Sequence, residues 1–142
     1  MKDAAATRRL VIATAVALPL QWLLAWLLGH VGGIVQTPVG FIDFTALLAV
    51  ALSMAVGGWI GGPRFTGVAI VITALVWIAT LIMLLIISQP LIQQPLPQAL
   101  AGVLRHNGLA VIASLVVAAL GAVAGNTLRQ ELKSPHSDSG TP

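Results

Sequence analysis

The most constraining feature of the sequence is the stretch 68–87, which reads VAIVITALVWIATLIMLLII and contains no charged side chain. About 20 apolar residues in a helix are enough to cross the hydrocarbon core of a bilayer. Three further segments also qualify, at about 10–28, 44–60 and 109–128. Because lipid offers backbone groups no hydrogen-bond partners, and because these segments lack strand-like alternation, each is predicted to be a helix. The expected fold class is all-α: a polytopic membrane protein with one four-helix transmembrane bundle over residues 1–128.

Composition favours a membrane over an aqueous environment. Of the 142 residues, 58% are hydrophobic and only 8% are charged, whereas soluble domains have roughly 25% charged residues. The net charge of +3 is small, and the chain lacks the interleaved basic and aromatic residues that single-stranded nucleic acid needs. We therefore expect the lipid bilayer, and not nucleic acid, as its surroundings. The absence of cysteine excludes disulfides and thiolate metal sites.

The basic residues predict the orientation of the chain. Six of the seven lie on one side of the four predicted spans, and only Arg105 falls in a loop on the other side. The six are Lys2, Arg8, Arg9, Arg64, Arg129 and Lys133. The positive-inside rule then places both termini in the cytoplasm. The polar segment 129–142 is expected to be a disordered cytoplasmic tail, and the Ala- and Leu-rich helices suit a bacterial inner membrane.

A glycine-rich stretch, AVGGWIGGPRF at 55–65, closes the second predicted helix. Its two G-x-x-x-G pairs have no strand or lysine of a phosphate loop beside them. Small residues allow membrane helices to approach closely, so we expect the second helix to pack against the fourth. A face that binds another protein, and a hinge, are the alternatives. The expected packing residues are Gly57, Gly58, Gly61, Gly62, Ser114, Ala118, Gly121, Ala122 and Gly125.

Two further patterns leave alternatives open. Arg9 and Trp22 have the same spacing as Arg64 and Trp77. This equal spacing is compatible with two parallel hairpin repeats, and also with a chance match, because apolar segments are built from few residue types.

In the loop 88–108, three prolines predict an extended first half. The apolar face of its second half predicts either a short interfacial helix or an early start to the fourth helix.

The sequence offers few candidates for a site. No ionisable residue lies in the middle of a predicted span, which argues against a proton-coupled exporter. His30, Asp43 and His106 are weak candidates for a metal site, and the alternative is that Asp43 pairs with Arg105 while the histidines meet lipid headgroups. The alternative site is a small polar pocket formed by four other side chains: Gln21, Thr73, Thr80 and Asn126.

These observations predict a protein without catalytic residues or cofactors. The favoured function is an accessory, assembly or anchoring subunit that acts by lateral helix packing, with another membrane protein or its own copies as partner. The alternative is an oligomeric pore or carrier for a neutral or apolar small solute. A third hypothesis is an enzyme or redox module built on His30, Asp43 and His106.

Overall fold

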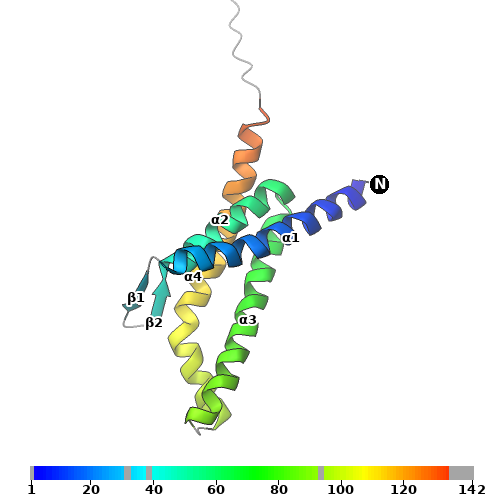
Figure 1. Ribbon diagram of the computed structural model, residues 1–142. Coiled ribbons are helices and arrows are strands. Elements are labelled where there is room, and N and C mark those ends of the chain that lie inside the picture. The colour runs from blue at the N-terminus through cyan, green and yellow to red at the C-terminus, as the bar shows by residue number, and fades with distance from the viewer. Residues whose placement is uncertain (1, 31–32, 38–39, 93–94, 135–142) are drawn as a thin grey trace, which may run out of the picture.

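The computed structural model describes residues 2–30, 33–37, 40–92 and 95–134 (Figure 1). Its elements follow in the order α1 (Lys2–Gly29), β1 (Ile34–Thr37), β2 (Gly40–Asp43), α2 (Phe44–Gly61), α3 (Phe65–Ile92) and α4 (Leu96–Glu131). All four helices are long and apolar enough to span a membrane. The predicted class, a helical membrane protein with four transmembrane helices, is confirmed at this level.

The helices extend beyond the predicted spans. α4 begins at Leu96 with Pro97 in its first turn, where amide groups lack intrahelical partners, so a missing N–H costs nothing. This matches the alternative of an early start to the fourth helix. At its other end α4 takes in the first three residues of the predicted tail, while 135–142 lie outside the described residues.

The prediction of an extended chain after residue 88 is wrong for 88–92, because α3 continues to Ile92. Pro90 falls in the last turn of α3, where it removes a single amide donor. A helix leaves its last four carbonyls without intrahelical partners wherever it ends, and continuing to Ile92 places them beyond the apolar run 68–87 instead of partly within it.

A short hairpin that the sequence reading did not anticipate joins α1 to α2. β1 and β2 pair antiparallel, with Ile34 opposite Asp43 and Thr37 opposite Gly40. β-branched and aromatic side chains at Ile34, Val35 and Phe41 favour the extended backbone. The Phe44 amide donates to the Gly33 carbonyl, and β2 also packs on α4. The hairpin therefore ties the start of α2 to the bundle.

The helices pack as an open series, α1–α2–α4–α3, and not as a closed ring. α2 makes its most extensive contact with α4, α1 packs mainly on α2, and α3 packs mainly on α4. Contacts of α3 with α1 and α2 are few. In Figure 1, α3 and α4 form an antiparallel pair whose lower part extends away from α1 and α2. α4 is thus the helix that holds α3 to the rest.

Three glycines bring the backbones of α2 and α4 together. A Cβ atom added at Gly121 would lie 2.5 Å from the Ala51 carbonyl oxygen. Added at Gly58 it would collide with the Ala122 backbone, and added at Gly125 with the Ala55 carbonyl. Any side chain at these positions would push the helices apart, so the closest part of the interface depends on glycine.

The two glycine pairs of α2 do not share one interface. Added Cβ atoms at Gly57 and Gly61 would meet the Phe65 side chain at the start of α3, and the one at Gly61 would also lie 3.1 Å from the Ala13 Cβ of α1. Of the adjacent residues Gly57 and Gly58, only Gly58 faces α4. The small residues of α2 therefore serve neighbours on two sides. On α4, Ser114, Ala118 and Ala122 are buried as well.

The hydrophobic core lies at the end of the bundle near the α2–α3 turn. Phe65 is its largest fully buried side chain, and all four helices contribute: Ala13, Ala17, Val50, Met54, Phe65, Ala69, Ala118 and Ala122. Away from this end the helices splay. Of the residues of α2, 33% are buried, whereas in the most apolar 18-residue window of α3 only 6% are, and no residue from 74 to 87 is buried. We call the region around Phe65 the closed end and the α3 segment 74–87 the splayed segment.

The α2–α4 contact predicts opposite effects for one substitution at two glycines of α4. Gly125→Ala should lower the free energy of unfolding by about 1–3 kcal/mol, because the new methyl group has no space against Ala55. Gly102→Ala is the control, since nothing lies within 4 Å of an added Cβ there. It should be neutral or stabilising by about 0.5–1 kcal/mol, because alanine favours helix over glycine. Unfolding in detergent, followed by circular dichroism, measures both, and equal stabilities would contradict this interface.

Candidate functional site

The two candidate histidines are exposed and bonded to their own helices or helix ends. The Nδ1–H of His30 donates to the Trp26 carbonyl at 2.7 Å, and its ring stands edge-on to the Trp26 indole with centroids 5.3 Å apart. The Nδ1–H of His106 donates to the Gly102 carbonyl at 2.8 Å. Each imidazole is thus positioned by the residue four places earlier. In the described part of the chain, no three His, Asp or Glu side chains gather as a metal-binding group.

Asp43 is the N-cap of α2. Its Oδ1 accepts hydrogen bonds from the Thr45 hydroxyl at 2.6 Å, from the Thr45 amide at 2.9 Å and from the Ala46 amide at 3.1 Å. The carboxylate thereby satisfies amides that the first helical turn leaves without partners. It caps the helix in this structure and does not form an ion pair with Arg105.

These bonds change the acidity of Asp43. The Thr45 hydroxyl lowers the pKa of the carboxyl group most, partial burial opposes this, and the amides of Ala46 and Thr45 lower the pKa further. Hydrogen bonds to the ionised form stabilise that form, which is why the net shift is downward.

The four candidates for a polar pocket do not converge. The hydroxyls of Thr73 and Thr80 donate to the Ala69 and Val76 carbonyls of their own helix, both at 2.8 Å. Asn126 lies near the α2–α3 turn, close to Gly62. Gln21 remains, and its Oε1 is buried without a hydrogen-bond partner among the described residues.

The structure brings together a set of side chains that sequence reasoning used only to predict orientation. The side chains are Arg9 of α1, Arg64 of the α2–α3 turn, Arg129 of α4 and Lys133, two residues after α4 ends; they surround two adjoining hollows at the closed end. We call these four the basic cluster. The hollow of about 400 Å³ is lined by Arg9, Trp59, Ile60, Arg129, Leu132 and Lys133. The hollow of about 360 Å³ is lined by Ala6, Arg9, Gly61, Gly62, Pro63, Arg64, Asn126, Arg129, Gln130 and Lys133.

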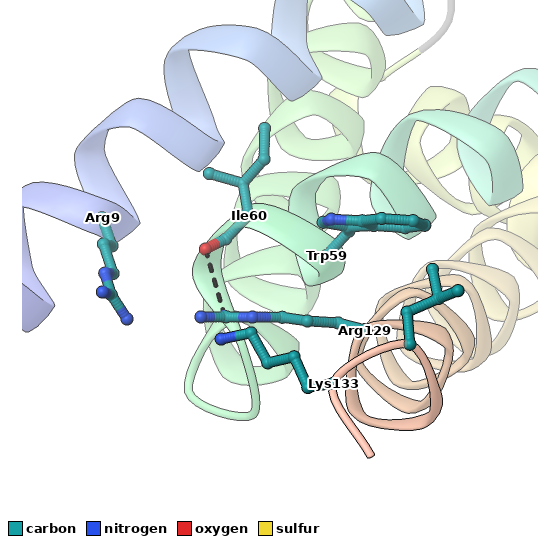
Figure 2. A pocket seen from close by; sticks show the side chains of 6 residues that line it. Arg9, Trp59, Ile60, Arg129 and Lys133 are labelled. Atoms are coloured by element: carbon teal, nitrogen blue, oxygen red, sulfur yellow. Dashed lines mark hydrogen bonds between the residues drawn. The ribbon is translucent and has the colours of Figure 1, made fainter. Parts of the chain in front are cut away.

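Local structure positions Arg129 within this cluster. Gly62 ends α2 with φ +75°, a conformation that L side chains rarely adopt. An added Cβ there would also lie 3.1 Å from the Arg129 Nη1, and that nitrogen donates to the Ile60 carbonyl at 3.4 Å (Figure 2). The guanidinium thus lies directly against the turn. A signal was present in the sequence, because basic residues at the same side of three segments must gather at one end of a bundle.

Comparison with known proteins does not assign the chain to a family. No protein-family model matches it, and neither a curated protein nor a solved structure shows significant similarity.

The Asp43 cap predicts a pH-dependent contribution to stability. Because its pKa is lowered in the folded protein, the contribution is present above the unfolded pKa (about 3.9) and is lost as pH falls through the folded pKa. Asp43→Ala should cost about 1 kcal/mol at neutral pH. Asp43→Asn should cost less, since asparagine also caps helices, and it removes this titration.

The free energy of unfolding of the wild type and both variants, determined in detergent from neutral to strongly acidic pH, measures the contribution of the Asp43 cap. The difference in stability between wild type and Asp43→Asn should shrink with acidification, because other carboxyl groups titrate in both proteins. A difference that does not change with pH would contradict the cap.

Proposed function

We propose that the chain is a small, non-enzymatic membrane protein that acts as an accessory, assembly or anchoring subunit through lateral helix packing. The observation that carries this proposal is the splayed segment of α3. It lacks buried residues from 74 to 87, and α3 has only α4 as a substantial neighbour. A helix with one neighbour inside its own chain has a face free for a second helix.

The chemistry of that face suits a protein contact. It carries Val71, Leu75, Ile78, Ile82 and Ile86, all exposed and spaced to lie along one side of the helix. Four of the five are β-branched, and such side chains have few rotamers in a helix. They lose little side-chain entropy on contact with another helix. Association in lipid depends on such packing, since hydrophobicity alone gives no preference for protein over lipid tails.

Hydrogen bonding within the helices weighs against the pore or carrier. Ser53 donates to the Val50 carbonyl at 3.0 Å, and Thr73 and Thr80 are bonded in the same way within α3. These hydroxyls have already used their single O–H donor within the helix and could offer a solute only acceptor lone pairs. The described positions of these side chains therefore favour lateral packing.

The orientation proposed for the chain has the closed end in the cytoplasm, with both termini on that side of a bacterial inner membrane. The gathering of Arg9, Arg64 and Arg129 at one end of the bundle supports it, because cytoplasmic flanks are enriched in arginine and lysine.

Labelling of single cysteines in intact cells tests this orientation. The chain has no cysteine of its own, so Ser134→Cys, three residues after α4, and Gln36→Cys on β1 report on opposite ends without background. A membrane-impermeant maleimide should label Gln36→Cys from outside, whereas Ser134→Cys should react only after permeabilisation. The reverse pattern would contradict the orientation.

Photocrosslinking in native membranes tests the proposed function. A benzophenone maleimide attached to Ile82→Cys, in the splayed segment, should give one discrete protein adduct that mass spectrometry can identify, either another membrane protein or a second copy of the chain. Leu120→Cys is the matched control, because Leu120 is an exposed apolar residue on α4. If the two probes give the same diffuse products, or lipid adducts alone, the proposal is wrong.

A further inference from the structure

The basic cluster places cations from separate elements around one space. Arg9, Arg129 and Lys133 each line both hollows. In Figure 2, Arg9 comes from one side, and the nitrogen ends of Arg129 and Lys133 point toward it from the other. On α4, Asn126, Arg129 and Gln130 follow at helical spacing and line one hollow together with Lys133, which comes just after the helix. The end of α4 therefore presents cations and amide donors together.

Three of the cations, Arg9, Arg129 and Lys133, lack a counter-charge in the part of the chain that the structure describes. No described carboxylate lies within ion-pair distance of Arg9, Arg129 or Lys133. Glu131 is two residues from Arg129 on α4, and residues at that spacing do not face each other on a helix. Like charges held together destabilise the fold, and an anion bound among them would remove that cost. The cluster thus has the electrostatics of an anion site.

We propose that the basic cluster binds a phosphate group, and that its main source is the headgroup of an anionic phospholipid. Guanidinium groups form paired, charge-assisted hydrogen bonds with phosphate oxygens. Hollows of about 360 and 400 Å³ fall within the size of small-ligand sites. Basic pockets between transmembrane helices are a recognised arrangement for anionic headgroups.

The walls of the larger hollow favour a lipid over a free phosphate. Trp59, Ile60 and Leu132 line it together with the cations, and Figure 2 shows the Trp59 ring beside the Arg129 side chain. A soluble phosphate uses only the charged part of such a site. A phospholipid places its phosphate among the cations and its glycerol and first methylene groups against the apolar wall. Tryptophan is itself enriched at this depth, between headgroups and hydrocarbon.

A lipid titration of the full-length chain tests the site. The protein is held in a neutral detergent, and short-chain phosphatidylglycerol, short-chain phosphatidylcholine and inorganic phosphate are the three probes, with binding followed by native mass spectrometry or calorimetry. The phosphatidylglycerol should bind at least about tenfold more tightly than the phosphatidylcholine, and more weakly as salt is raised.

Two arginines that are adjacent in the sequence provide a matched pair of variants. Arg9→Gln should weaken phosphatidylglycerol binding by about tenfold, as expected for loss of one charge-assisted contact. Arg8→Gln removes the same charge from the same turn of α1, but Arg8 lines neither hollow, so its effect should stay within about twofold. Lys133→Gln should resemble Arg9→Gln and provides a second measurement from the segment that follows α4.

The outcomes separate the sources of the phosphate. Phosphatidylglycerol binding that depends on Arg9 but not on Arg8, with weak binding of inorganic phosphate, supports the lipid site. If inorganic phosphate binds as tightly as the lipid with the same dependence, the cluster is a phosphate site and the assignment to lipid is overturned. Equal effects of Arg8→Gln and Arg9→Gln, or equal binding of the two lipids, would overturn the proposal entirely.

Discussion

The contact between the backbones of α2 and α4 is the interaction on which the other contacts of this fold depend. Hydrophobic association is weak between helices in lipid, so close van der Waals packing has to hold them together. At Gly58, Gly121 and Gly125 the two helices approach more closely than any side chain would allow. α1 is attached to this pair through α2, and α3 through α4. Loss of the contact would therefore separate two hairpins and not merely loosen one helix.

The four helices could be predicted from sequence because an apolar stretch in lipid has few alternatives to a helix. Side-chain direction was harder to predict. Consecutive residues point about 100° apart on a helix, so Gly57 and Gly58 face different neighbours, and the choice depends on where α1, α3 and α4 lie. The β1–β2 hairpin escaped prediction because four-residue strands are too short to show a clear alternation.

For the candidate site residues too, local roles could be predicted from the sequence and tertiary contacts could not. Asp43 immediately before an apolar run is a recognisable N-cap pattern, and its role could have been predicted without any tertiary information. The sequence reading instead paired it with Arg105, a contact that required knowledge of the fold. For the basic cluster, the sequence predicts the side of the membrane but not that Arg129 on α4 and Lys133 just after it lie around one hollow with Arg9. That arrangement results from the α2–α4 contact and the Gly62 turn.

The lengths of α2 and α4 have a consequence for how each helix lies in the bilayer. α2 has 18 residues between the Asp43 cap and Gly62, which is about 27 Å at 1.5 Å per residue. α4 has 36 residues, or about 54 Å, against a hydrocarbon thickness of about 30 Å. The apolar stretch of α4 is only 109–128, which is about 30 Å and close to that thickness. The surplus at 96–108 and 129–131 carries Arg105, His106 and Arg129, so α4 extends through the headgroup region on both sides, whereas α2 spans little more than the hydrocarbon core.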